Sequence, residues 1–291
     1  MLPLLAYLFI ALVWGSTFAA IAIAMKAFTP FGLVGARFVI GGLLAVGAGW
    51  MRGERYDLKA EWGTLLVTGL LMILGTFTLM FWAETRLSSG LTALLVATQP
   101  ILFVLMARER LSPLGWTGMA IGLLGVALVA GLSSREAFSL GGAAAVLLGE
   151  VLWSAGTLLG KARFRSRSGF ARTGWQMIAG GAPALFIIAL PGGHLFAAPP
   201  TREAVLAALY LALFGSALAF SAYLYLVDVW PASRVGTYAY LNAPIAVLVG
   251  AWFLGEPFTL RMALGALTVL AGVALVEYAP RSAAPILEGE G

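Results

Sequence analysis

The sequence contains no cysteine and only one histidine, His194, among its 291 residues. The lack of cysteine excludes disulfide bonds, thiol catalysis and thiolate metal sites, and one histidine is too few for a histidine-based metal cluster. Charge is also scarce, because Asp, Glu, Lys and Arg make up 11% of the chain, against about 25% in an ordinary soluble domain. We therefore expect no metal centre, no cofactor and no water-soluble fold.

Hydrophobic residues make up 61% of the chain, and they gather in runs long enough to cross a bilayer, for which a helix needs about 20 residues. Breaks rich in charged residues, Pro and Gly separate the runs. We predict an all-α integral membrane protein with ten transmembrane helices, at residues 4–25, 31–51, 62–83, 88–107, 113–131, 139–160, 170–190, 203–227, 232–254 and 259–278. The first run lacks a preceding basic segment, so we interpret it as a membrane span and not as a removable signal peptide.

Lys and Arg residues lie mostly in the breaks on one side of the predicted bundle. With the N-terminus in the cytoplasm, twelve of them fall on the cytoplasmic side and five on the other. Because cytoplasmic loops carry the excess of basic residues, this bias places both termini in the cytoplasm. It also accounts for the net charge of +5 without a nucleic-acid partner. Residues 279–291 are predicted to form a disordered cytoplasmic tail.

The two halves of the sequence match at an ordered series of positions. Chance similarity between Gly- and Leu-rich helices would explain any single pair, but less readily a series that includes two Trp, two Pro and two Glu residues. The matches are Trp14 with Trp153, Pro100 with Pro244, Glu109 with Glu256, and 125–129 with 272–276, both Gly-Val-Ala-Leu-Val. We predict one five-helix repeat at 1–134 and a second at 135–278. Since five crossings is an odd number, the second repeat would be inverted, as in many secondary transporters.

The chain resembles the EamA-type members of the drug/metabolite transporter superfamily over nearly its whole length, from about Leu8 to Val276. The resemblance is carried by Trp14-Gly15-Ser16-Thr17-Phe18, Ala36-Arg37-Phe38, Gln99-Pro100, Glu109-Arg110-Leu111-Ser112 and Leu254-Gly255-Glu256-Pro257. It implies a ten-helix carrier around a central cavity, which moves small metabolites outward across the inner membrane of a bacterium. The best-known bacterial members export amino acids, including aromatic ones.

Two prolines lie at matching positions of the predicted fourth and ninth spans, Pro100 and Pro244. Proline lacks a backbone N–H and frees a carbonyl one turn earlier, so both are candidate gating or hinge residues beside a mid-membrane site. Gln99 and Asn242, close beside them, are candidate substrate-binding amides, and Tyr238, one turn before Asn242, is a further candidate. The alternative is that the prolines only kink the helices and that the amides bond to neighbouring helices.

Aromatic residues form a second set of candidates. Trp14 and Trp153 lie mid-span, where a buried indole N–H needs a partner that a cavity would supply, whereas tryptophan usually gathers at the membrane surfaces. The other candidates near them or on neighbouring spans are Thr17, Phe18, Phe77, Phe81, Thr157 and Tyr225. Such aromatic faces with small polar groups suit an amphipathic solute with a planar part. They suit plain helix packing equally well.

Two ionisable residues are predicted to lie deep in the membrane, where a charge is costly and often functional. Glu150 is near the middle of the sixth span, and Arg37 is about two turns into the second. We interpret Glu150 as a residue that binds a substrate ammonium group or carries a coupled proton. The alternative is a protonated, hydrogen-bonded carboxyl inside the bundle. Arg37 is interpreted as structural, paired with a helix terminus or a carboxylate.

These patterns favour a secondary transporter that exports small amphipathic metabolites, amino acids first, by alternating access. A carrier of drugs, nucleosides or organic cations is an alternative. A membrane-embedded transferase would need a convergent nucleophile, base or metal cluster, and a channel would need polar stripes along several helices; the sequence shows neither. Without a Walker A motif, an ATP-driven pump is not favoured. We therefore predict no enzyme activity.

The predicted partners are the lipid bilayer and a small-molecule substrate. Glycines form smooth faces on the predicted fifth and tenth spans, at Gly115, Gly118, Gly122 and Gly125 and at Gly265 and Gly272. Small residues let membrane helices approach closely, within one chain or between two. The sequence is therefore compatible with a monomer or a homodimer.

Overall fold

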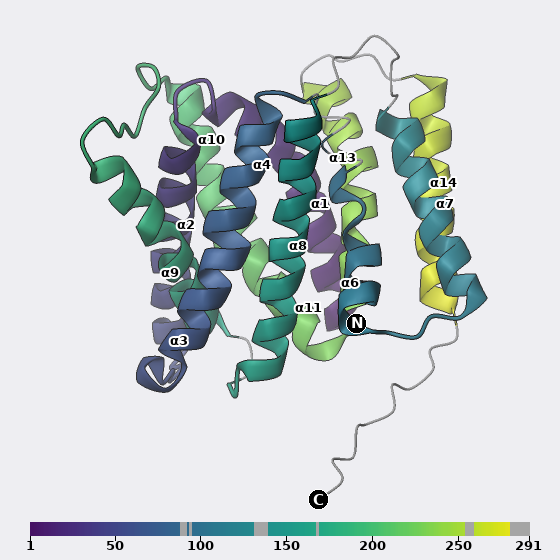
Figure 1. Ribbon diagram of the computed structural model, residues 1–291, viewed down its shortest axis with the longest axis horizontal. Coiled ribbons are helices and arrows are strands. Elements are labelled where there is room, and N and C mark those ends of the chain that lie inside the picture. Colours follow the sequence, from purple (N-terminus) through teal and green to yellow (C-terminus); the bar gives the residue numbers. More distant parts are fainter. Residues whose placement is uncertain (88–91, 93–94, 131–138, 167–168, 254–258, 280–291) are drawn as a thin grey trace, which may run out of the picture.

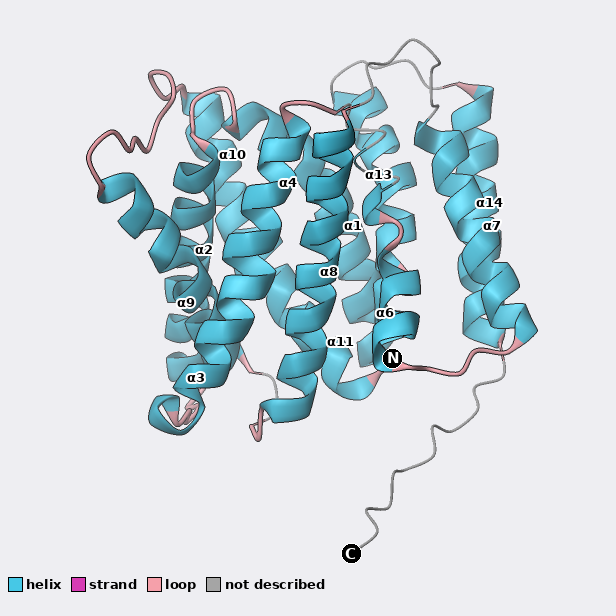
Figure 2. Ribbon diagram, in the orientation of Figure 1, coloured by secondary structure: helices cyan, strands magenta, loops and turns pink. Residues whose placement is uncertain are grey.

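The computed structural model describes residues 1–87, 92, 95–130, 139–166, 169–253 and 259–279, and its regular elements are all helices (Figures 1 and 2). The bounds are α1 Leu2–Ala24, α2 Pro30–Met51, α3 Leu58–Gly69, η1 Leu70–Gly75, α4 Thr76–Glu84, α6 Gln99–Ala107, α7 Pro113–Ala130, α8 Leu140–Arg163, α9 Phe170–Ala189, α10 Arg202–Tyr210, η2 Leu211–Leu218, α11 Ala219–Val229, α12 Ala232–Gly236, α13 Tyr238–Phe253 and α14 Leu260–Tyr278. Over the same described residues, an isolated bridge joins Phe28 to Phe196 and no strand forms.

Each of the ten apolar runs predicted from the sequence contains helix, and within the described residues six helices are long and apolar enough to cross a membrane. Two of the six are composite: Leu58–Glu84 joins α3, η1 and α4, and Arg202–Val229 joins α10, η2 and α11. The surface of the bundle exposes large apolar side chains such as Leu43, Leu267 and Trp252. Such a surface suits lipid and not water, in agreement with the predicted all-α membrane protein.

Several helices begin at a side chain that accepts a hydrogen bond from the first turn. The capping residues are Thr29, Ser139, Thr201 and Thr259, each bonded to the backbone N–H three residues later. They start α2, α8, α10 and α14. Caps of this kind stabilise a helix by about 1 kcal/mol, and here they fix where the chain leaves a loop and enters the bundle.

Two long helices contain a π-helical segment near the middle, η1 and η2, in which the turns are wider than in an α-helix. The sequence had indicated irregular backbone at the two prolines. Pro244, however, lies inside α13, which continues through it. Pro100 lies in the first turn of α6, directly after a turn at Ala97 and Thr98. Neither π-helical segment contains a proline, so the prolines mark only part of the irregular backbone.

α7 and α14 pack against each other along their glycines, as do α2 and α9. A Cβ atom on Gly118 would lie 2.8 Å from the backbone nitrogen of Val276, and one on Gly265 would lie 2.7 Å from that of Val129. Backbones approach this closely only where a side chain is missing. The predicted glycine faces therefore meet within one chain (Figure 1), so they are not free to form a dimer interface.

α1 begins and α14 ends at the same face of the bundle, the lower face in Figure 1; the opposite face is called the upper face. α1 packs against α13, α11 and α10, and large buried side chains such as Tyr223 and Phe220 surround it. This central position of α1 places its middle turns at the interior site. Residues 280–291 of the predicted tail at 279–291, and Glu256, lie outside the described residues.

Candidate functional site

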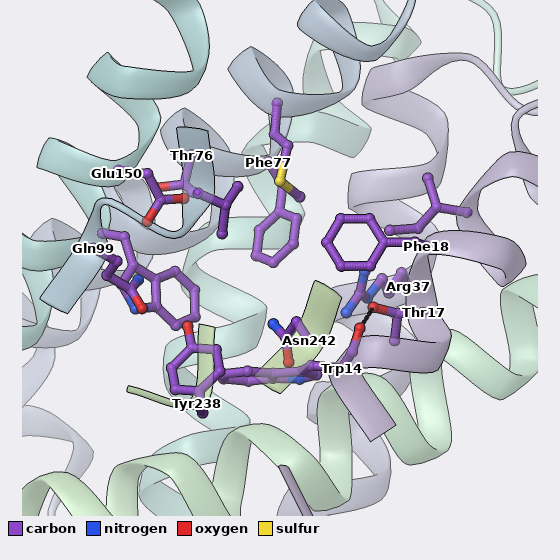
Figure 3. A pocket seen from close by; sticks show the side chains of 14 residues that line it. Trp14, Thr17, Phe18, Arg37, Thr76, Phe77, Gln99, Glu150, Tyr238 and Asn242 are labelled. Carbon is purple, nitrogen blue, oxygen red and sulfur yellow. Dashed lines mark hydrogen bonds between the residues drawn. The ribbon is translucent and has the colours of Figure 1, made fainter. Parts of the chain in front are cut away.

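A partly open cavity lies within the bundle, and the empty space in and around it is about 520 Å³. Its walls come from α1, α2, α4, α6, α8 and α13 and from the chain just before α6 (Figure 3). The lining residues are Trp14, Thr17, Phe18, Ile21, Arg37, Thr76, Phe77, Met80, Val96, Gln99, Glu150, Trp153, Tyr238 and Asn242. Aromatic walls with a few polar groups are typical of small-molecule sites.

Nine of the twelve residues predicted to bind substrate line this cavity: Trp14, Thr17, Phe18, Phe77, Gln99, Glu150, Trp153, Tyr238 and Asn242. The other three lie elsewhere. Phe81 lines a second pocket with Phe18, at the upper ends of α1 and α4. Thr157 forms a hydrogen bond with Tyr223, and Tyr225 lines a pocket at the lower end of α11. Each of the three lies on the helix expected, but at another depth or on another face.

Aromatic rings close the lower side of the cavity. The ring of Trp14 lies 5.7, 5.3 and 4.7 Å from those of Trp153, Tyr223 and Tyr238, and we call these four residues the aromatic floor. Trp14 donates from Nε1 to the carbonyl of Gly215 at 2.8 Å, and Trp153 donates from Nε1 to the Tyr223 hydroxyl at 2.9 Å. Both indole N–H groups therefore bond to protein, whereas the sequence had suggested that a cavity would supply their partners.

Tyr223 is the member of the aromatic floor that the sequence analysis missed. It is completely buried on α11, and its hydroxyl also bonds with Thr157 at 2.8 Å. The candidate predicted from the sequence, Tyr225, lies two residues further along the same helix and on another of its faces. Both faces are rich in apolar residues, so hydropathy alone does not distinguish the face that turns inward.

Arg37 lies at one end of the cavity, beside Phe18 (Figure 3), and is only 2% exposed. Its Nε donates to Ser216 Oγ of η2 at 2.9 Å. Its guanidinium carbon lies 4.9 Å from the ring centre of Phe38 and 5.0 Å from that of Phe77, within the range of cation–π attraction. Arg37 takes part in none of the ion pairs among the described residues. One of its two terminal nitrogens, Nη1, is buried without a hydrogen-bond partner. A hydroxyl and two rings thus replace the carboxylate or helix terminus expected beside it.

Glu150 lies at the opposite end of the cavity, near Thr76 and Gln99 (Figure 3). It is 4% exposed, and its Oε2 atom is buried without a partner, as are the side-chain oxygens of Gln99 and Asn242. A buried polar atom without a partner costs about 1–3 kcal/mol. Together with Arg37, the wall holds four such atoms, and a polar ligand would satisfy them. Within the described part of the chain, no three His, Asp or Glu side chains gather as a metal site.

Comparison with known proteins gives a family and a fold. The model of the EamA-like transporter family matches residues 1–131 and 140–278. The chain is 32% identical over 263 residues to the uncharacterised inner membrane transporter YedA of Escherichia coli K12, over 88% of this chain and 84% of YedA. It is 26% identical over 272 residues to the uncharacterised transporter YvbV of Bacillus subtilis, over 92% of this chain and 89% of YvbV. A known crystal structure matches 93% of this chain and 94% of its own, with a TM-score of 0.78 at 21% identity, which shows the fold alone.

Proposed function

This chain belongs to the EamA-like transporter family and is a multi-pass membrane transporter, not an enzyme, and from that premise we propose that it exports small amphipathic metabolites. Amino acids, including aromatic ones, are the first candidates. The substrate would bind in the central cavity, and the bundle would open to the two sides of the membrane in turn.

The observation that carries this proposal is the chemistry of the cavity wall. Polar atoms without partners lie at both ends, on Arg37 and on Glu150 with Gln99, and aromatic rings lie between them. A small solute with a polar headgroup and an apolar part would satisfy both kinds of surface. The nine predicted residues that line the cavity are therefore proposed as substrate-binding residues.

An organic cation is the second candidate substrate. Glu150 supplies a carboxyl in the cavity, and the aromatic residues Trp14, Trp153 and Tyr238 line its wall. Aromatic faces attract cations, by about 2 kcal/mol or more where water is excluded. A carrier of organic cations would use the carboxyl and the rings to bind its substrate, whereas the positive guanidinium group of Arg37 would repel it.

The two five-helix repeats at 1–134 and 135–278 are proposed to be inverted relative to each other. In support, the family model matches two stretches that nearly coincide with these halves. The two π-helical segments also occupy similar places, each near the middle of the third predicted span of its half. Carriers of this architecture move one unit against the other around a mid-membrane site. Pro100 and Pro244 remain proposed hinges. Pro244 removes one backbone hydrogen-bond donor from the interior of α13, and Pro100 lies in the first turn of α6, directly after the turn at Ala97 and Thr98.

We assign the lower face to the cytoplasm, because the excess of Lys and Arg lies in the loops of that side. The aromatic floor then separates the cavity from the cytoplasm. On the other side, Phe18 lines both the cavity and the second pocket toward the upper face. This arrangement supports an outward-facing state, in which Phe18 is the side chain between the binding site and the outside.

The assigned orientation predicts the accessibility of single introduced cysteines. Because the natural chain has no cysteine, Lys59→Cys and Arg202→Cys each create one unique thiol at an exposed position. We expect a membrane-impermeant maleimide to label Arg202→Cys in intact cells, and Lys59→Cys only after the membrane is permeabilised. The reverse pattern would place the lower face outside and would refute the assignment.

The transport activity is tested with the purified protein in proteoliposomes. We expect uptake of at least one radiolabelled amino acid, strongest among the aromatic ones, above the level of protein-free liposomes across a range of pH. Uptake of an organic cation such as tetraphenylphosphonium, with no uptake of any amino acid, would replace the first candidate by the second. Transport of neither class would contradict the proposed substrates.

A further inference from the structure

We propose that Arg37 binds a carboxylate group of the substrate, so that this carrier selects carboxylates and zwitterions over amines and organic cations. The inference rests on the proposed function, because it names the chemical class that the central cavity takes. It also gives a binding role to a residue that the sequence suggested was structural.

A guanidinium group keeps its proton under all ordinary conditions, and Arg37 is 2% exposed within the bundle. Among the described residues, the acid that acts on it electrostatically is Glu84, which lines the neighbouring pocket and forms no ion pair with it. A buried charge without an oppositely charged group in contact with it is strongly unfavourable. An anionic group that enters the cavity would provide the missing contact.

The guanidinium group is held in place, because Nε is bonded to Ser216 and the rings of Phe38 and Phe77 lie within cation–π distance of it. This leaves the terminal nitrogens for a ligand, and Nη1 has no partner in the protein. Two terminal N–H groups in a fixed plane match the two oxygens of a carboxylate. Lysine at this position would supply the charge without that match.

Glu150 lies at the end away from Arg37, beside the side chain of Gln99 (Figure 3). A carboxylate placed there would meet a group of the same kind, whereas an ammonium or hydroxyl group would find acceptors. The cavity therefore has an anion-binding end at Arg37 and a donor-binding end at Glu150, with Phe77 and Phe18 near the path between them.

The test compares two ligands of nearly the same shape, 3-phenylpropanoate and its neutral amide, by calorimetry with the purified full-length protein. We expect the natural protein to bind the carboxylate about tenfold or more tightly than the amide, and Arg37→Gln to bind both about equally. Arg52→Gln is the matched control, because Arg52 is an exposed arginine beyond the end of the same helix. We expect it to keep the preference for the carboxylate.

An equal preference in the natural protein and Arg37→Gln would overturn the proposal, as would a natural protein that does not prefer the carboxylate. If Arg37→Gln fails to fold, Arg37→Lys takes its place. We expect the preference of Arg37→Lys for the carboxylate over the amide to be about tenfold weaker than that of the natural protein, because the paired hydrogen bonds are lost. An unchanged preference in Arg37→Lys would contradict the paired geometry. Proteoliposome uptake separates the two proposals, since a protein that prefers the carboxylate but moves no amino acid would refute the proposed function alone.

Discussion

Trp14→Ala is expected to reduce substrate uptake by about tenfold or more. The change removes the central ring of the aromatic floor, which touches three other rings, and the hydrogen bond from Nε1 to the Gly215 carbonyl. Truncation of a buried tryptophan typically costs about 3–5 kcal/mol, and here the lost atoms also form part of the cavity wall. We expect a lower affinity for substrate and a weaker seal between the cavity and the lower face. Initial rates of uptake into proteoliposomes measure the effect.

Two further variants make this result specific. Trp14→Phe keeps an aromatic ring but loses the indole N–H, so we expect an intermediate rate. Trp50→Ala removes a tryptophan that is 80% exposed near the end of α2, and we expect it to transport normally. If Trp14→Ala reconstitutes as a folded protein and transports at the natural rate, the aromatic floor plays no part in transport.

Gly118→Ala is expected to destabilise the protein by about 1–3 kcal/mol, although only one methyl group is added. The new Cβ would lie 2.8 Å from the nitrogen of Val276 and 2.9 Å from the carbonyl oxygen of Gly272. Both atoms belong to the backbone of α14, so α7 and α14 would have to move apart along their contact. The effect is measured as a lower midpoint of thermal unfolding in detergent.

Gly47→Ala is the matched control for this prediction. Gly47 lies in α2, and a Cβ added there would meet nothing within 4 Å. Alanine is favoured over glycine within a helix by about 0.5–1 kcal/mol, so we expect this variant to be as stable as the natural protein or slightly more stable. Equal losses in both variants would mean that the α7–α14 contact is not the cause.

Much of the fold was predictable because the membrane constrains hydropathy so strongly. A run of about 20 apolar residues has few alternatives to a helix in lipid, and all ten predicted runs contain helix. The π-helical segments were not predictable, since η1 and η2 consist of ordinary apolar and small residues. Their wide turns depend on contacts with other helices, which no single run of sequence displays.

The candidate site was predictable where a residue type is out of place in its surroundings. Trp14, Gln99 and Glu150 lie mid-span in apolar helices, and polar or indole groups there turn inward to find partners; all three line the cavity. Tyr223 was missed, because an apolar helix gives no indication of which of its faces is buried. The surroundings of Arg37 were also missed, since Ser216 and Phe77 come from distant parts of the sequence.

The η2 segment connects two parts of the cavity through adjacent residues. Gly215 accepts the hydrogen bond of Trp14, and Ser216 accepts that of Arg37. A π-helical turn contains one residue more than an α-helical turn. If this extra residue moves along the helix by one turn, the residues of that turn rotate about the helix axis by about 100°. Such a step would swing both acceptors away together, without breaking the helix. A single change of backbone register would thus free both Trp14 of the aromatic floor and the guanidinium group of Arg37 from their hydrogen bonds to η2.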